Sequence, residues 1–151
     1  EIFMPTVKIR SLVASDKPAW EILWSNYLKF YETSLPVSMF NLAFERLISP
    51  DENEYTGLIA LLSGEAVGIA HTLKHRHGWK EQKVIYLQDL FVSESTRGSG
   101  VARELIAEIY RRADSEGTPD VYWLTATTNS TARGLYDKIA VDSGLIQYTR
   151  Y

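Results

Sequence analysis

The segment Arg97-Gly98-Ser99-Gly100-Val101-Ala102 has the residue types and spacing of a loop that binds a diphosphate. It follows the apolar run 84–92 and opens a stretch of helical periodicity, so it lies between a predicted strand and a predicted helix. The start of a helix presents unpaired backbone N–H groups and a partial positive charge. Gly98 and Gly100 let a phosphate approach the backbone closely, and Arg97 adds a full positive charge.

Two other nucleotide-binding loops fit this segment poorly. A P-loop ends in Gly-Lys-Ser or Gly-Lys-Thr, which the segment lacks. A dinucleotide-binding fold has Gly-x-Gly-x-x-Gly near its first strand, whereas here Arg103 stands at the third small position, roughly two-thirds along the chain. On the loop alone, a glycine-containing helix start without any ligand remains an equal alternative.

The elements that position this loop follow from hydrophobic periodicity. Strands are predicted at 7–10, 55–62, 66–74, 84–92, 121–125 and 145–151, and the turn Ser63-Gly64-Glu65 joins the second to the third. Helices are predicted at about 16–31, 38–48, 98–116 and 129–141. The order β-α-α-β-β-β-α-β-α-β indicates an α/β (α+β) domain with an antiparallel front half and a β-α-β unit behind it.

Composition excludes several classes of function. Hydrophobic residues make up 45% of the 151 residues and the net charge is −3, which fits one globular domain and argues against nucleic-acid binding through a basic surface. The absence of cysteine excludes disulfides and thiolate sites, and it fits a cytoplasmic protein. No apolar run approaches the ~20 residues of a membrane span, and no signal peptide opens the chain, so we expect no membrane partner. The clustered His71, His75 and His77 indicate a partly exposed strand and turn, and no metal site is expected.

Two motifs together resemble the GNAT superfamily of acyl-CoA-dependent N-acetyltransferases. The run 86–92 (YLQDLFV) followed by Arg97 to Ala102 is similar to motif A, Arg/Gln-x-x-Gly-x-Gly/Ala, with Arg97, Gly100 and Ala102 in its fixed positions. Downstream, Asn129 and Tyr136 are seven residues apart, as in motif B, and this spacing puts both on one helix face. The resemblance implies a single GNAT-like domain over residues 1–151, with a mixed, mostly antiparallel central sheet and helices on both faces.

The resemblance also implies a role for each motif residue. Backbone amides of the loop hold the pyrophosphate of acetyl-CoA, the end of the preceding strand pairs with the pantetheine arm, and Tyr136 protonates the departing CoA thiolate. Lys138 or Arg103 could reach the adenosine 3′-phosphate. The residues expected to bind acetyl-CoA are Leu90, Phe91, Val92, Arg97, Gly98, Ser99, Gly100, Val101, Ala102, Asn129 and Tyr136.

The base that deprotonates the amine departs from the family pattern. Members that acetylate polyamines have Leu-Glu-Asp where this chain has Leu87-Gln88-Asp89, and Gln88 cannot accept a proton at neutral pH. Asp89 is adjacent, but strand alternation points it to the opposite face unless a β-bulge turns it, and a purely structural role is equally open. Glu32 is the second candidate, in the segment that would border the acceptor site.

The acceptor is expected to be a small-molecule primary amine, such as a polyamine, an amino acid or a lysine-like compound. Tyr27, Tyr31 and Trp79 could hold its cation by cation–π contact, and Glu32 and Gln88 complete the expected acceptor site. Alternatives are a protein or histone lysine acetyltransferase, an acyl-CoA-binding sensor without turnover, and an interaction domain. The resemblance further implies a homodimer.

Overall fold

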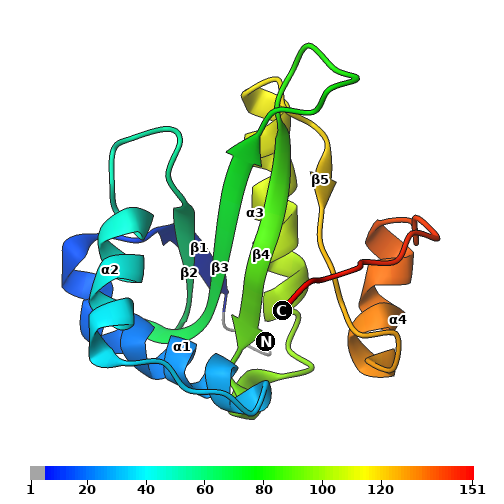
Figure 1. Ribbon diagram of the computed structural model, residues 1–151. Coiled ribbons are helices and arrows are strands. Elements are labelled where there is room, and N and C mark those ends of the chain that lie inside the picture. The colour runs from blue at the N-terminus through cyan, green and yellow to red at the C-terminus, as the bar shows by residue number, and fades with distance from the viewer. Residues whose placement is uncertain (1–5) are drawn as a thin grey trace.

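Alternating apolar side chains on consecutive strands build a five-stranded sheet in the computed structural model, which describes residues 6–151 (Figure 1). The strands lie in the order of the chain, and the first four pair antiparallel while the last pairs parallel to its neighbour. Their bounds are β1 Val7–Ser11, β2 Thr56–Leu62, β3 Glu65–His75, β4 Val84–Val92 and β5 Val121–Tyr122. The predicted mixed, mostly antiparallel sheet is confirmed.

Helices cover both faces of this sheet, as predicted. Helices α1 and α2 pack on one face and α3 on the other, and α4 lies beyond β5 (Figure 1). Single 3-10 turns at Ala14–Asp16 and Glu94–Thr96 precede α1 and α3. The helix bounds are α1 Lys17–Phe30, α2 Val37–Leu47, α3 Val101–Ser115 and α4 Ser130–Ile139.

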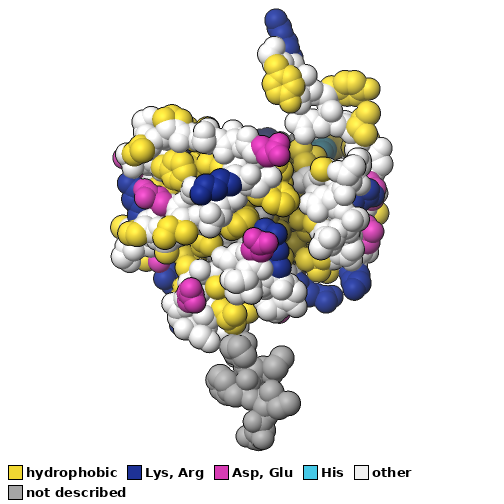
Figure 2. Space-filling view, turned by 90° about the horizontal axis from the view of Figure 1, so that it is seen from below, with side chains coloured by type: hydrophobic (Ala, Val, Ile, Leu, Met, Phe, Trp, Pro, Cys, Tyr) yellow, Lys and Arg dark blue, Asp and Glu magenta, His cyan; other side chains and the backbone are white. Residues whose placement is uncertain are grey.

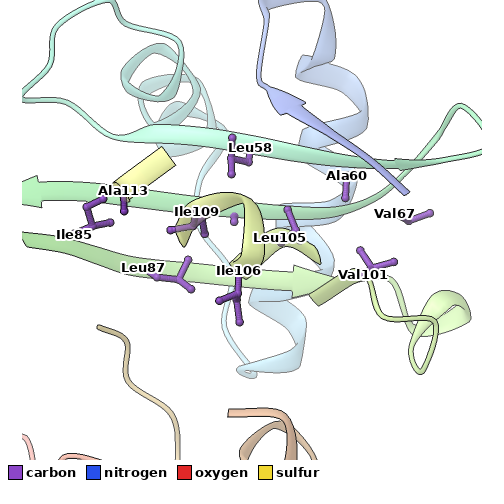
Figure 3. Packing of buried hydrophobic residues seen from close by; sticks show 11 residues of the cluster. Leu58, Ala60, Val67, Ile85, Leu87, Val101, Leu105, Ile106, Ile109 and Ala113 are labelled. Carbon is purple, nitrogen blue, oxygen red and sulfur yellow. The ribbon is translucent and has the colours of Figure 1, made fainter. Parts of the chain in front are cut away.

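The face under α3 is an aliphatic core. Leu105 and Ile106 are fully buried there, and Figure 3 shows them against Leu58 of β2 and Leu87 of β4. Close approach of α3 depends on Gly68 of β3, where a Cβ atom would lie 3.1 Å from a Val101 methyl carbon and 3.2 Å from one of Leu105. Burial of this stripe provides most of the free energy that holds α3 to the sheet.

The opposite face, under α1 and α2, is aromatic. Trp20 and Trp24 stack with ring centroids 5.0 Å apart, and Phe40 and Phe44 pack against them. This core also contains His71, which is only 3% exposed. The expectation that all three histidines lie on a partly exposed strand and turn is therefore wrong for His71, because its place on β3 points it into the α1 face.

A β-bulge in β4 changes which side chains face which core. His71 pairs with Asp89 and Thr72 pairs with Leu87, so Gln88 has no partner residue on β3. Leu87 before the bulge and Leu90 after it both face the α3 core, whereas Phe91 belongs to the α1 core. The extra residue thus turns Asp89 toward the α1 face.

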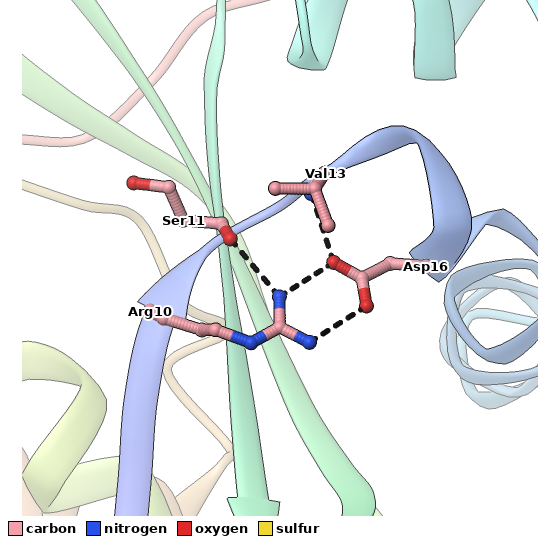
Figure 4. A network of polar contacts seen from close by, with 4 residues as sticks. All are labelled: Arg10, Ser11, Val13 and Asp16. Carbon is pink, nitrogen blue, oxygen red and sulfur yellow. Dashed lines mark hydrogen bonds and ion pairs between the residues drawn. The ribbon is translucent and has the colours of Figure 1, made fainter.

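An ion pair ties β1 to the beginning of α1. Arg10 donates two hydrogen bonds to the Asp16 carboxylate, at 2.7 and 2.9 Å, and the Val13 N–H donates a third at 2.8 Å (Figure 4). The hydrogen bonds from Arg10 hold the pKa of Asp16 below its ordinary value, because they stabilise the ionised form. Asp16 therefore orients the chain that enters the aromatic core.

The C-terminal part differs from the sequence prediction. Residues 145–151 form no strand, and β5 ends at Tyr122 instead of Thr125. Strand formation requires a neighbouring backbone to pair with. The segment 140–151, which follows α4, has no such neighbour among the described strands, and its apolar side chains are exposed to solvent (Figure 1).

Helix α3 starts at Val101, three residues later than predicted, because Gly98 and Gly100 both have a φ of +85°. Within residues 6–151, no helix has the length and apolarity needed to cross a membrane.

Candidate active site

Strands β4 and β5 begin as neighbours and then separate, and a pocket of about 890 Å³ opens between them. Only Ile85 with Val121 and Tyr86 with Tyr122 are paired. Beyond that point β4 continues to Val92, and none of the described strands pairs with this stretch on the β5 side. One wall of the pocket is therefore a strand edge with free backbone groups, and the other is formed by residues 123–125 and α4.

The predicted diphosphate loop lies at the end of this pocket. Gly98, Gly100, Val101 and Ala102 line it, and in the described chain none of their backbone N–H groups donates to a protein acceptor. The positive φ of Gly100 aims the first turn of α3 at the pocket, and a Cβ atom there would meet only open space. Arg97 and Ser99 differ, since their N–H groups already donate to Glu94 and Thr96. The loop therefore presents four free donors at the positive end of a helix.

Basic side chains surround the mouth of the pocket. The Arg97 guanidinium lies 5.7 Å from the Phe30 ring centroid and 5.9 Å from that of Phe91, which places it between α1 and the end of β4. Arg103 of α3 and Lys138 of α4 also line the pocket. Figure 2, a view from below, shows hydrophobic side chains at this end of the molecule with both basic and acidic side chains among them, whereas the charged residues that line the pocket are all basic. The pocket thus combines an apolar interior with a cationic rim, which suits a long ligand with a phosphorylated end.

Tyr136 projects into the pocket from α4. Its ring lies edge-on to Trp123, with centroids 5.3 Å apart. Burial raises its pKa, and the neighbouring Tyr31 raises it further. The phenol is therefore protonated at neutral pH, as a proton donor must be.

Asn129 lines the pocket on the same side as Tyr136, as their spacing predicts. Its side-chain oxygen accepts a hydrogen bond from the Ala132 N–H at 3.4 Å and caps α4, and its amide donates to the Thr125 hydroxyl at 3.3 Å. The predicted helix cap is confirmed. These contacts fix the start of α4, and so the position of Tyr136 along the wall.

The three candidates near the acceptor end occupy different places. Gln88 is exposed and lines the pocket. Asp89 lies behind the wall, where its carboxylate is 2.8 Å from Nδ1 of His71. Glu32 is exposed just after α1, in a left-handed conformation with a φ of 55°, and it is not part of the pocket lining.

Two of the three expected aromatic acceptor residues are brought together, whereas Trp79 is exposed in the loop between β3 and β4 and does not line the pocket. Tyr27 and Tyr31 of α1 both line the pocket, with ring centroids 5.0 Å apart. Burial raises the pKa of Tyr27 well above its ordinary value, and the nearby charges of Asp89 and Tyr31 raise it further. Tyr27 therefore connects the pocket with the carboxylate behind its wall.

Several residues of the site were missed in the sequence. Trp123, Leu124 and Thr125 line the wall opposite β4, although their apolar pattern reads as the continuation of a strand. The separation of the two strands depends on long-range pairing that no local pattern reveals. His71 and Trp20 were also missed as partners of Asp89, since only the register of β3 against β4 brings them together.

Comparison with known proteins agrees with this geometry. The family model described as the Acetyltransferase (GNAT) family matches residues 17–140. A D-amino-acid N-acetyltransferase of Saccharomyces cerevisiae is 37% identical over 145 residues, which cover 95% of this chain and 90% of that protein.

Solved structures share the fold at lower identity. An aminoglycoside N-acetyltransferase in complex with CoA is 20% identical with a TM-score of 0.83, covering 99% of this chain and 97% of its own. A ribosomal-protein-alanine N-acetyltransferase from Brucella melitensis biovar Abortus 2308 is 20% identical with a TM-score of 0.77, covering 97% of this chain and 99% of its own.

Proposed function

This chain belongs to the GNAT family of acetyltransferases, and we propose that it moves an acetyl group from acetyl-CoA to the primary amine of a small molecule. The observation that carries the proposal is the pocket between β4 and β5, with four free backbone donors at one end and Tyr136 in its wall. The chain is an N-acetyltransferase by family. The donor and the kind of acceptor are inferred from the site.

The chain's residues fit acetyl-CoA along the length of the pocket. The free N–H groups of Gly98, Gly100, Val101 and Ala102 suit the pyrophosphate, and Arg103 and Lys138 stand where a further phosphate would be neutralised. The unpaired edge of β4 offers alternating donors and acceptors to the two amide groups of a pantetheine arm, in the way that a sheet edge accepts another strand.

The chemistry then requires a base, an oxyanion donor and an acid. An alkylammonium ion has a pKa near ~10 and must lose a proton before it can attack a thioester. A backbone N–H of the β4 edge can donate to the carbonyl oxygen as negative charge develops on it. Tyr136 supplies the proton that the departing thiolate takes up, since its raised pKa keeps the phenol protonated. Asp89 is the proposed base, acting through Tyr27, because Gln88 is not basic and Glu32 lies outside the pocket lining.

Small amines are favoured as acceptors. The acceptor end is bordered by Tyr27, Tyr31 and Gln88, which can contact a cation through ring faces and an amide oxygen. The yeast relative is named for D-amino acids, and the structural neighbour for aminoglycosides. Both kinds of compound carry primary amines and belong in the test panel.

One experiment separates turnover from binding alone. Purified protein is incubated with acetyl-CoA and a panel of D-amino acids, polyamines, aminoglycosides and a lysine peptide, and thiol release is followed. We expect release that depends on a small amine. Tight acetyl-CoA binding, seen as a raised melting temperature, without release by any amine would instead identify a sensor.

We further propose that two copies of the chain associate through residues 140–151. This segment exposes Val141, Leu145, Ile146 and Tyr148, which is unusual for an isolated chain, and β5 has a free outer edge. Light scattering on the full chain and on a variant ending at Asp142 tests this. We expect a dimer and a monomer respectively, and a monomeric full chain would contradict the proposal.

A further inference from the structure

A continuous hydrogen-bond chain runs behind the acceptor wall, from α1 through β3 to β4. The indole Nε1 of Trp20 donates to Nε2 of His71 at 3.0 Å, and Nδ1 of His71 lies 2.8 Å from a carboxylate oxygen of Asp89. Trp20 is 0% and His71 is 3% exposed. Burying such polar groups costs free energy unless each has a hydrogen-bond partner. Here the indole N–H of Trp20 and both ring nitrogens of His71 have one.

The direction of each hydrogen bond in this chain is determined by chemistry. An indole N–H can only donate, so Nε2 of His71 must be the unprotonated, accepting nitrogen. The single ring proton of a neutral imidazole then lies on Nδ1, from which it is donated to Asp89. Trp20 therefore fixes the tautomer of His71, and His71 holds one oxygen of the Asp89 carboxylate.

The bulge at Gln88 makes this contact possible. If residues 87 to 89 alternated regularly, with no bulge, Asp89 would lie with Leu87 on the aliphatic face under α3. With it, Asp89 lies opposite His71 on the α1 face, beside Tyr27. His71 binds one oxygen of the carboxylate, Oδ2, and leaves the other for the proton transfer proposed below.

We propose that His71 and Trp20 are positioning residues that hold the Asp89 carboxylate ready to receive, through the Tyr27 hydroxyl, the proton that leaves the acceptor amine. This inference rests on the proposed function. In the step, the Tyr27 oxygen takes a proton from the ammonium group while its own O–H proton passes to Asp89. The ammonium becomes a neutral amine, Asp89 becomes a carboxylic acid, and Tyr27 is unchanged.

The ionisation of Tyr27 agrees with a concerted transfer. Burial and the charge of Asp89 raise the pKa of this phenol, so a free phenolate is not accessible at neutral pH. A hydroxyl that gives its proton to a carboxylate as it receives another avoids the phenolate altogether. Of the groups near Asp89, Tyr86 is likewise affected by its charge, which raises the Tyr86 pKa after the larger effect of burial.

The test compares variants that keep or remove a single donor. His71→Leu removes the donor to Asp89, and we expect kcat to fall about 10²-fold while the KM for acetyl-CoA changes less than about twofold. His71→Asn places an amide N–H near the position of Nδ1, and we expect recovery to within about fivefold of the wild-type kcat. An unchanged kcat in a folded His71→Leu variant would overturn the proposal.

Two tryptophans on the same helix provide a matched control. Trp20→Phe removes the donor to His71, whereas Trp24→Phe removes an indole N–H that is buried without any partner. We expect kcat to fall about tenfold in Trp20→Phe and less than about twofold in Trp24→Phe. Equal losses in the two variants would show that the tryptophans act only by packing.

Nitrogen NMR of histidine-labelled wild-type protein gives a readout independent of activity. We expect the His71 ring to carry its proton on Nδ1, and this signal to move to Nε2 or to exchange in Trp20→Phe. A proton on Nε2 in the wild type would refute the positioning chain even if turnover is found. Failure of every amine to release thiol would refute the proposed function and leave this measurement valid.

Discussion

The two faces of the central sheet are packed with different types of side chain, and each face lies next to a different end of the pocket. Under α3 the core is aliphatic, and the free N–H groups at the start of that helix lie at the end of the pocket where we propose that the cofactor binds. Under α1 the core is aromatic and encloses the His71–Asp89 pair beside the acceptor end. Aliphatic side chains offer no hydrogen-bond donors, so the proposed binding of acetyl-CoA at this face depends on backbone N–H groups. The aromatic face keeps water away from the Asp89 carboxylate and provides His71 as its hydrogen-bond donor.

The largest expected effect is a loss of acetyl-CoA affinity caused by a change at the proposed cofactor end alone. Gly100→Asp puts a carboxylate where the phosphate would approach, and like-charge contact of several kcal/mol should weaken acetyl-CoA binding about 10³-fold by calorimetry. Gly64→Asp is the control, because Gly64 also has a positive φ, of 81°, and open space around it, but lies in the β2–β3 turn. Normal affinity in Gly100→Asp would refute the assignment of the loop.

The second prediction concerns the stability of the aliphatic face. Leu105→Ala removes a fully buried side chain, and the loss of packing should lower the free energy of unfolding by about 3 kcal/mol in urea. Ile22→Ala, at a side chain 65% exposed on α1, should change it by less than about 0.5 kcal/mol. Similar losses in both variants would show that α3 is not held by this core.

The third prediction concerns the proton donor between the two faces. Tyr136→Phe should lower kcat about 10²-fold with little change in acetyl-CoA affinity, because only the leaving thiolate loses its acid. Tyr110→Phe removes another phenol hydroxyl, which donates to the Ile139 carbonyl at 2.9 Å outside this pocket. Thiol-release rates of the two variants should differ by nearly the full factor. Equal rates would exclude Tyr136 as the acid.

A fourth, smaller effect tests how the aromatic face is anchored. Folding lowers the pKa of Asp16, so its contribution to stability is present above the ordinary value of 3.8 and is lost as the pH falls through the lower folded value. Asp16→Asn should therefore cost about 1 kcal/mol at pH 7, and its difference from the wild type should shrink toward pH 3. The exposed Asp142→Asn, which breaks a pair with Arg133, should cost less than about 0.5 kcal/mol.

The smallest expected change is in stability at Trp24. Trp24→Phe loses some packing but also relieves a buried N–H without a partner, so the two contributions should offset each other to within about 0.5 kcal/mol. Trp20→Phe should be about 1–3 kcal/mol worse, since Nε2 of His71 is left buried without a donor. Equal urea midpoints would contradict the difference assigned to these two indoles.

Local patterns predicted the arrangement of α3 and α4 around the pocket well, and the arrangement of residues near Asp89 poorly. The four-residue repeat of Val101, Leu105, Ile109 and Ala113 specifies the buried stripe of α3, and it lies on the core as expected. The spacing of Asn129 and Tyr136 likewise placed both in one wall. Such features depend on neighbours along the chain, which the sequence displays directly.

The features that were missed depend on partners far away in the chain. The direction of Asp89 depends on the register of β4 against β3, and its contact with His71 joins residues that no local period relates. The run 145–151 shows why alternation is insufficient, because a strand needs a neighbouring backbone that this segment does not have within the described chain.

The bulge at Gln88 has a consequence for how this protein can diverge. The identity of residue 88 is loosely constrained by packing, since its side chain is exposed. The faces on which its neighbours lie are tightly constrained, because the same residues in unbroken alternation would place Asp89 and Phe91 in the aliphatic core and Leu90 and Val92 in the aromatic one. At this position, evolution can exchange the side chain or remove the residue with a single codon, because deletion of Gln88 would leave Leu87 opposite Thr72 and Asp89 opposite His71.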